Sequence, residues 1–288
     1  MSINLPKVSI VTITYGHEKY ITETLDGVLM QQYDGSVEFI IANDNSPDAT
    51  DEVVKKYFSE NPAPENFEIK YTKHDTNKGM MPNFIWALEQ ATGKYIAICE
   101  GDDYWTDPQK LHRQVDFLEK NTDYSMVAEN CKVLDERHNQ SYIFSDKINS
   151  YDVSIDEIVM GRKFHTASIL FRNENLKMPA NYSLFPFGDT LLFVVLAKAG
   201  KIIYLPNISL VYRRNEGGTS TGKNRYLWAQ NVEKFNLLLN EYLEGKFKDI
   251  HWRNIYLNYY SGLKWSVKTG HIGLACKSLY KFLQYKKK

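Results

Sequence analysis

The sequence predicts an α/β protein in which helices flank a mainly parallel sheet and a helical extension follows at the C-terminus. Two observations support this class. Short β-branched runs alternate with helical stripes of apolar residues through the first hundred residues, at the spacing of β-α-β units. From residue 225 onward the apolar residues recur at the spacing of a helix.

The first hundred residues contain four expected strands and three expected helices. The strands are the apolar, β-branched runs 8–14, 37–42, 67–72 and 95–99. The helices are a stripe from Ile21 to Leu29, the segment 48–61, and a segment that has Pro82 in its first turn and stops at Gly93. In an open parallel sheet, ligands bind beyond the carboxyl ends of the strands. We therefore expect the polar clusters 14–16, 43–46 and 100–103 to face one crevice.

The expected elements are more mixed after residue 105. Thr106 and Asp107 precede Pro108 at the start of a helix, and mixed strands and loops continue to about residue 222. Two helical stripes follow, with Gly270 between them. The first stripe comprises Trp252, Ile255, Tyr256, Tyr259 and Leu263, and the second comprises Ile272, Ala275, Cys276, Leu279 and Leu283.

Charge is unevenly distributed along a chain that has 35 basic and 35 acidic residues. Residues 223–288 hold 13 Lys and Arg against 4 Asp and Glu, a net charge of +9, which leaves −9 for residues 1–222. The balanced total gives no indication of nucleic-acid binding. The basic, aromatic-rich segment 223–288 indicates a separate role, either on an anionic membrane or in packing against the rest of the chain or a second subunit.

Nothing in the sequence indicates secretion or a metal site built from cysteines. The three cysteines are widely spaced, so we expect reduced and mostly buried thiols. The first residues lack the pattern of a signal peptide, and apolar runs such as 191–197 are too short to span a membrane. We therefore expect a cytoplasmic protein, peripheral at the inner face of the plasma membrane if residues 223–288 bind lipid.

Two adjacent aspartates, Asp102 and Asp103, follow the fourth expected strand and a glycine that lets the backbone turn. Mg²⁺ and Mn²⁺ prefer oxygen ligands and often combine one or two carboxylates with the phosphates of a substrate. The chain has neither a G-x-G-x-x-G motif after the first strand nor a P-loop, so phosphate binding would rely on a metal. The alternative is that Asp103 or Asp107 caps the next helix and that Asp102 is only solvated.

Two residues after the other strands are candidates for binding a nucleotide. Tyr15 offers a ring that can stack on a base, and Asp44 offers an acceptor for a base imide or a ribose hydroxyl. The alternatives are a tyrosine packed in a turn and an Asx turn at Asp44.

Three sequence blocks together resemble the N-terminal half of family 2 glycosyltransferases of the GT-A fold. The blocks are VSIVTITYGHEKYITETLDGVLMQQY, EFIIANDNSPDAT and NKGMMPNFIWALEQATGKYIAICEGDDYW, and their order and spacing match the family across roughly residues 6–120. The resemblance implies a Rossmann-like sheet, a Mn²⁺ or Mg²⁺ ion, and inverting transfer of a hexose or N-acetylhexosamine. It also implies a nucleotide-diphospho-sugar donor, usually a UDP-sugar, without identifying the sugar.

The resemblance implies roles for individual residues of this chain. Asp103 corresponds to the metal ligand, and Asp102 lies nearer the ribose or the sugar of the donor. Asp44 matches the acid that contacts the base, and Tyr15 lies at the base-stacking position. Lys78 falls where the family often places a residue near the nucleotide or the diphosphate.

The first turn departs from the family pattern. It reads Ile13-Thr14-Tyr15-Gly16 in place of the common Pro-Thr-Tyr-Asn, and we still expect Ile13 and Thr14 to contribute to the donor site. The usual Asp-Asp pair after the second strand is Asn43-Asp44, which keeps the second acid. Neither change removes a group that the chemistry requires.

An inverting transfer also needs a base, because the acceptor hydroxyl must lose its proton as it attacks the anomeric carbon. Asp189, in the segment FPFGDTLLFVVLAKAGK, resembles the base motif of the family in its spacing after the metal motif. The alternative is that Asp189 caps the helix that follows. Both can hold, since a helix N-terminus stabilises a carboxylate anion.

Three further residues are assigned from the later part of the chain. Arg213, in a basic segment before a glycine-rich one, is expected to pair with phosphate or else to lie in a solvated loop. His165 and Trp105 are expected on the acceptor side, and a buried structural role is the alternative for His165. Asn215 stands near the usual histidine of the family, so we assign no metal ligand there.

These inferences describe a metal-dependent inverting glycosyltransferase with a catalytic domain at 1–222, divided into a nucleotide-binding half, 1–104, and an acceptor half, 105–222. The expected acceptor is a saccharide or a lipid-linked saccharide in surface polysaccharide synthesis, and a homo-oligomer remains open. One rival is a noncatalytic nucleotide-sugar binding protein of the same fold, which would not need Asp189. The other is a sugar-nucleotidyltransferase, whose glycine-rich N-terminal signature is absent from the sequence.

Overall fold

The computed structural model describes residues 5–215 and 224–287, which fall into two compact units. The first unit comprises Met1–Ser154, Lys163–Lys177 and Val195–Asn215, and the second comprises Ile155–Arg162, Met178–Val194 and Glu216–Lys288. The predicted boundary between residues 222 and 223 lies outside the described residues.

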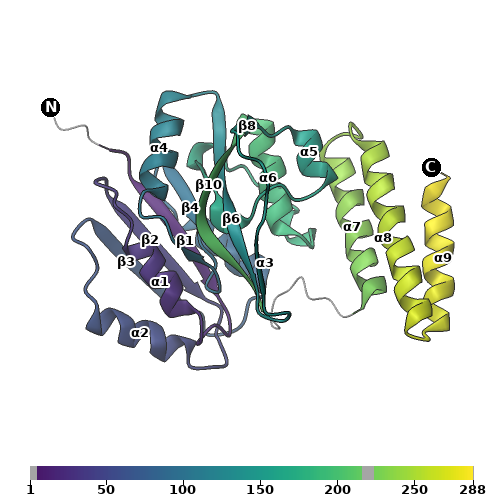
Figure 1. Ribbon diagram of the computed structural model, residues 1–288, viewed down its shortest axis with the longest axis horizontal. Helices are drawn as coiled ribbons and strands as arrows, with labels where there is room; N and C mark the ends of the chain where they lie inside the picture. Colours follow the sequence, from purple (N-terminus) through teal and green to yellow (C-terminus); the bar gives the residue numbers. More distant parts are fainter. Residues whose placement is uncertain (1–4, 216–223, 288) are drawn as a thin grey trace. The chain divides into compact units, whose positions relative to one another are not determined.

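The first unit is built on a ten-stranded sheet in the order β3-β2-β1-β4-β9-β6-β10-β5, with β7 beside β6 and β8 beside β10 (Figure 1). The strands are β1 (Val8–Thr14), β2 (Val37–Asn43), β3 (Phe67–Lys73), β4 (Tyr95–Ile98), β5 (Tyr104–Trp105), β6 (Tyr124–Asp135), β7 (Gln140–Ile143), β8 (Tyr151–Asp152), β9 (Leu170–Arg172) and β10 (Lys201–Arg214). The first four strands pair in parallel, and β10 is parallel to β6. β9 runs antiparallel between β4 and β6. The predicted mainly parallel α/β fold is confirmed, with its antiparallel strands in the second half of the sheet.

Four helices connect the strands of the first unit: α1 (Ile21–Leu29), α2 (Thr50–Glu60), α3 (Met80–Glu89) and α4 (Lys110–Lys120). Pro82 is the third residue of α3, so its missing N–H falls in the first turn, where no helical partner exists. Gly27 allows α1 to approach β5 closely, since a Cβ atom there would lie 2.7 Å from the backbone nitrogen of Trp105. The apolar faces of α1, α2 and α4 share one buried core with the sheet.

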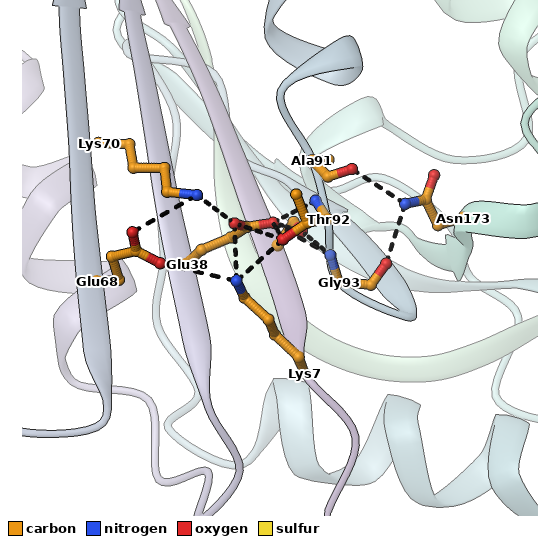
Figure 2. Close-up of polar contacts among 9 residues, drawn as sticks. Lys7, Glu38, Glu68, Lys70, Ala91, Thr92, Gly93 and Asn173 are labelled. Atoms are coloured by element: carbon orange, nitrogen blue, oxygen red, sulfur yellow. Dashed lines mark hydrogen bonds and ion pairs between the residues drawn. The ribbon is translucent and has the colours of Figure 1, made fainter.

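Glu38 is a fully buried carboxylate at the second position of β2, near the amino ends of the strands (Figure 2). Its Oε2 atom lies 3.0 Å from Nζ of Lys7 and 2.7 Å from Nζ of Lys70. The Ser9 hydroxyl and the Thr92 backbone N–H donate to Oε1. Burial raises the pKa of Glu38, but the hydrogen bonds from Lys70, Ser9, Thr92 and Lys7 outweigh it and hold the pKa well below its usual range. The carboxylate therefore joins β1, β2, β3 and the loop before β4 at the amino end of the sheet.

The second unit is largely helical. Its helices are α5 (Ile155–Met160), α7 (Arg225–Tyr242), α8 (Lys248–Lys268) and α9 (Ile272–Lys286), and the residues of α6 (Gly188–Ala199) are divided between the two units. Ala229, Ile255, Tyr259 and Tyr285 form a buried cluster among α7, α8 and α9. The helices predicted for 225–288 are confirmed, and Gly270 lies between α8 and α9 with a φ of +75°. Across the described part of the chain, no helix has the length and apolar character needed to cross a membrane.

Candidate functional site

The polar residues that follow β1, β2 and β4 meet at the carboxyl ends of these adjacent strands. Asp44 donates its backbone N–H to the Thr14 carbonyl at 3.0 Å, and Gly101 donates its own to the Ile13 carbonyl at 3.0 Å. The Tyr15 side chain beside them is 48% exposed. The three clusters expected to face one crevice therefore lie side by side, because parallel pairing aligns the ends of the strands.

Asp44 organises the turn that enters α3. Its carboxylate is buried and accepts the backbone N–H groups of Lys78 at 2.7 Å and Gly79 at 2.9 Å. Gly79 has a φ of +88°, which favours glycine, and the Lys78 side chain is exposed. The Asx turn considered for Asp44 is not what the structure shows, since both Asp44 oxygens accept N–H groups of the turn before α3; the neighbouring Asn43 side chain accepts the Ser46 N–H at 2.8 Å.

Asp103 is buried and is hydrogen-bonded to two other segments of the first unit. Its side chain is 3% exposed, and Oδ1 accepts the backbone N–H of Arg213 at 2.8 Å. Burial, together with the negative charges of Asp102 and Glu100, raises the pKa of Asp103 well above its usual range. Its main-chain carbonyl accepts the Thr24 hydroxyl at 2.7 Å. The alternative that Asp103 caps α4 is not what the structure shows, since α4 begins at Lys110 without a side-chain cap.

Asp102 is the more accessible carboxyl group of the pair. It is partly exposed, and its Oδ2 accepts Nδ2 of the buried Asn215 at 3.1 Å. The prediction that Asp103 is the metal ligand stays untested. Asp103 is the less exposed of the two residues.

Thr14 and His17 place two buried polar atoms beside Gly101. A Cβ atom on Gly101 would lie 2.8 Å from Oγ1 of Thr14 and 2.8 Å from Nδ1 of His17. Neither atom has a hydrogen-bond partner within residues 5–215 and 224–287. Burial lowers the pKa of His17, while the nearby charge of Asp102 acts in the opposite direction. The sequence analysis overlooked His17, although its position in the turn after β1 could have indicated it.

Arg213 anchors the acidic motif from β10. Its Nε donates to the Asp102 carbonyl at 2.9 Å, Nη1 donates to Glu136 at 2.8 Å, and Nη2 donates to Glu23 at 2.5 Å. The side chain is 6% exposed, so it does not belong to a solvated loop. The expected contact between Arg213 and phosphate stays a prediction, because the described contacts of the guanidinium are with protein groups.

His165 and Trp105 lie inside the first unit. The His165 ring stacks on Tyr212 with centroids 3.7 Å apart and meets Phe144 edge-on at 4.5 Å. Trp105 is 1% exposed, and its indole N–H donates to the Ala167 carbonyl at 2.8 Å. Their predicted acceptor-side role is untested, and the buried structural alternative for His165 agrees with its packing.

Asp189 belongs to the second unit and is the second residue of α6. Its carboxylate is ion-paired with Arg162, and Oδ1 accepts the backbone N–H of Thr190 at 2.7 Å. A carboxylate in the first turn of a helix is stabilised as an anion. The ion pair between Arg162 and Asp189 was not predicted from the sequence.

Residues 5–215 and 224–287 do not by themselves supply a complete cation site. No group of three or more His, Cys, Asp or Glu side chains in the described ranges could hold a metal ion. A divalent cation at Asp102 would therefore take most of its ligands from elsewhere, and diphosphate oxygens are suitable ligands. The partly exposed carboxylate and the unpaired Thr14 hydroxyl both fit a hard, oxygen-preferring ion.

Comparison with known proteins identifies the family. The model of glycosyl transferase family 2 matches residues 9–175. An uncharacterized protein of Mycobacterium tuberculosis is 36% identical over 213 residues, which cover 73% of this chain and 60% of the relative. The putative teichuronic acid biosynthesis glycosyltransferase TuaG of Bacillus subtilis is 28% identical over 162 residues, 54% of this chain and 60% of TuaG. The chain thus spans about 60% of the length of these relatives.

Two solved structures share the fold. Staphylococcus aureus TarS 1–349 in complex with UDP-GlcNAc has a TM-score of 0.71 at 20% identity and covers 97% of this chain and 81% of its own. The mannosyltransferase PcManGT of Pyrobaculum calidifontis, in complex with GDP-Man and Mn²⁺, has a TM-score of 0.62 at 16% identity, with 99% and 83% covered. With the family match over residues 9–175, the chain belongs to glycosyl transferase family 2 and has the GT-A fold.

Proposed function

We propose that the chain transfers a hexose or N-acetylhexosamine from a UDP-sugar to a hydroxyl group, with inversion at the anomeric carbon. The observation that carries the proposal is the meeting of Thr14, Asp44 and the Gly101-Asp102 turn at adjacent strand ends, with Asp102 partly exposed. Membership of glycosyl transferase family 2 supports it. The fold shared with TarS, whose structure was determined with UDP-GlcNAc, is consistent with it.

The nucleotide would lie over the ends of β1 and β2. Tyr15 is exposed enough for its ring to stack on the base. Each oxygen of Asp44 accepts one N–H and retains a lone pair, so Asp44 can still accept a hydrogen bond from the base or ribose. Ile13 and Thr14 are the last two residues of β1, directly before Tyr15, and the exposed Lys78 can approach the diphosphate.

We assign the metal-facing role to Asp102 rather than to Asp103, because Asp102 is partly exposed and Asp103 is 3% exposed. A bound Mn²⁺ or Mg²⁺ would neutralise the charge that develops on the leaving diphosphate. Asp103 and Arg213 would act as positioning residues, since Arg213 holds the Asp102 carbonyl and the Asp103 carboxyl together.

Asp189 is the proposed base. It would accept the proton of the acceptor hydroxyl as the acceptor oxygen bonds to the anomeric carbon and the bond from that carbon to the diphosphate breaks. Arg162 is ion-paired with the Asp189 carboxylate. A glycosyltransferase needs a base of this kind, whereas a noncatalytic protein that binds nucleotide sugars does not.

The acceptor is proposed to be a saccharide or lipid-linked saccharide of a surface polysaccharide. The relative TuaG is described as a putative enzyme of teichuronic acid biosynthesis, which supports this setting. Because Trp105 and His165 are buried, we expect them to shape the acceptor side indirectly, by packing.

Calorimetric titration of UDP with Mn²⁺ and with EDTA tests the proposal. We expect metal-dependent UDP binding that weakens at least about tenfold in Asp102→Asn, since a bridging cation loses its protein carboxylate. Asp116→Asn is the matched control, because the Asp116 side chain on α4 is 50% exposed and is ion-paired with Lys120.

Two results would contradict the proposal. The nucleotide site is wrong if UDP binds in neither condition, and the metal assignment is wrong if Asp102→Asn leaves the EDTA effect unchanged. Release of sugar from UDP-glucose, UDP-galactose, their N-acetyl forms and GDP-mannose then distinguishes an enzyme from a noncatalytic binding protein. Formation of a nucleotide sugar from a sugar phosphate and UTP would instead indicate a sugar-nucleotidyltransferase.

A further inference from the structure

Helix α9 exposes an apolar stripe on the side that does not pack against α8. This outer face consists of Ile272, Cys276, Leu279 and Leu283, which recur at intervals of three or four residues and therefore share one side of the helix. Ile272 is 77% exposed, Leu279 42% and Leu283 46%. The sequence analysis identified this stripe as apolar, and the structure shows that it faces outward.

A partly buried carboxylate on α7 fixes the rotation of α9. Glu233 on α7 accepts Nζ of Lys281 at 2.7 Å and the Tyr285 hydroxyl at 2.5 Å. The Tyr259 hydroxyl of α8 also donates to Glu233, and Ser278 is fully buried on the same inner side. Because Glu233 would lose its two partners on α9, Lys281 and Tyr285, if α9 turned over, the outer face cannot rotate inward without a large cost.

The segment that carries the outer face is basic and has no acidic residue. Residues 250–288 hold eight Lys and Arg and no Asp or Glu. Lys277 and Lys286 on α9, and Lys287 directly after it, are exposed, whereas Lys281 is ion-paired with Glu233. An apolar stripe flanked by lysines is the composition of helices that lie in a membrane interface.

We propose that the outer face of α9 binds the surface of an anionic lipid bilayer, with the helix parallel to the membrane plane. The side chains of Ile272, Leu279 and Leu283 enter the boundary between head groups and acyl chains, and the lysines contact the lipid phosphates. A helix of 15 residues that carries this pattern lies on a bilayer and does not span it.

Charge favours lipid over a second copy of the chain. A symmetric dimer through this face would place Lys277, Lys286 and Lys287 near the same residues of the other copy, without an acidic partner in residues 250–288. Anionic lipid head groups supply the missing negative charge. The inference does not depend on the proposed transfer reaction, since it is measured by lipid binding alone.

Vesicle flotation tests the proposal with the full chain. Vesicles of phosphatidylglycerol and phosphatidylcholine in a 3:7 ratio, chosen as an approximate anionic membrane, are compared with pure phosphatidylcholine. We expect binding to the anionic vesicles only, weakened by high salt. The triple variant I272Q/L279Q/L283Q should lower the partition coefficient at least about tenfold, because it removes the apolar contacts.

A matched variant controls for surface hydrophobicity. I148Q/I208Q/L227Q replaces three apolar side chains that are exposed elsewhere, at 83%, 46% and 55%, and should bind vesicles as the parent chain does. Unchanged circular dichroism of both variants confirms that they fold. Equal vesicle binding by the two triple variants would overturn the proposal.

Cysteine labelling provides a second measurement. Cys276 is exposed on the outer face, whereas Cys99 and Cys131 are buried, so an environment-sensitive fluorophore on the folded chain reports on this face. We expect its emission to shift to the blue on anionic vesicles. An unchanged emission would contradict immersion of the face, and so would a parent dimer that binds no vesicles and becomes monomeric in I272Q/L279Q/L283Q.

Discussion

Replacing Glu38 by glutamine tests whether the buried network at the amino end of the sheet stabilises the first unit. The change keeps the shape of the side chain and removes its charge. The NH2 group of the glutamine is itself a donor and would meet other donors. Glu38 accepts hydrogens from Ser9, from the Thr92 N–H and from two lysines, Lys7 and Lys70 (Figure 2). At least one of these donors would be left without an acceptor.

The expected loss is about 3 kcal/mol in the free energy of unfolding. Removing one member of a buried ion pair costs about 3–5 kcal/mol. We take the lower end of this range, because the Lys7 and Lys70 side chains are 34% and 35% exposed and can turn toward water. Glu68 provides a matched control, since it lies 3.7 Å from the same Lys7 and 3.6 Å from Lys70 but is 60% exposed. Glu68→Gln should cost at most about 0.5 kcal/mol.

Thermal unfolding at neutral pH is a suitable assay. For a unit of this size, 3 kcal/mol corresponds to a fall in Tm of roughly 6–12 °C, against about 2 °C or less for Glu68→Gln. The pH dependence provides a second test. Because the folded-state pKa of Glu38 is depressed, its contribution is present above the unfolded pKa of about 4.3 and is lost as pH falls below that value. The difference between the parent chain and Glu38→Gln should therefore narrow from pH 6 toward pH 3, values chosen to bracket about 4.3.

A similar Tm for Glu38→Gln and Glu68→Gln would refute this reasoning. A difference between the parent chain and Glu38→Gln that does not change with pH would refute the electrostatic part alone. The lost stability would then come from packing or from neutral hydrogen bonds, whose contributions do not titrate in this range.

Three other changes test the strand-end residues and the proposed base. Gly101→Ala places a methyl group 2.8 Å from Nδ1 of His17, so UDP affinity measured by calorimetry should fall at least about tenfold, whereas Gly273→Ala, with open space around its Cβ, should not alter it. Arg213→Lys cannot form the three guanidinium hydrogen bonds and should lower stability by about 2–4 kcal/mol in thermal unfolding; an unchanged Tm would show that these bonds contribute little. Asp189→Asn should keep UDP affinity within about twofold while sugar transfer falls at least about a hundredfold, and near-normal transfer would exclude Asp189 as the base.

The strand ends could be predicted because local pattern determines them. The β-branched run of β1 and the apolar run of β2 each end in polar residues, and parallel strands align their ends. The family match over residues 9–175 and the mainly parallel sheet confirm what these patterns indicated about class. The spacing of residues along the chain was sufficient for this, since strand and helix periods are properties of short segments.

The tertiary structure decided which of the two adjacent carboxylates, Asp102 or Asp103, is the more accessible to solvent. Asp102 and Asp103 are adjacent and chemically identical, and the difference arises because Arg213, 110 residues after Asp103, donates its backbone N–H to the buried carboxyl group. Trp105 is also buried in the core, although its position in the sequence suggested a contact with the acceptor. Such differences cannot be inferred from local pattern, because desolvation depends on which distant segments cover a residue.

The C-terminal helices show the same division between what the sequence determines and what the tertiary structure decides. The sequence by itself determined that residues 225–288 are helical and basic, and that Ile272, Leu279 and Leu283 lie on one side of a helix. Only the tertiary structure decided which side of α9 faces inward, because the hydrogen bonds from Lys281 and other groups to Glu233 orient the helix. An apolar stripe has the same period whether it packs in a core or faces solvent, so its direction is set by contacts between helices and not by the stripe itself.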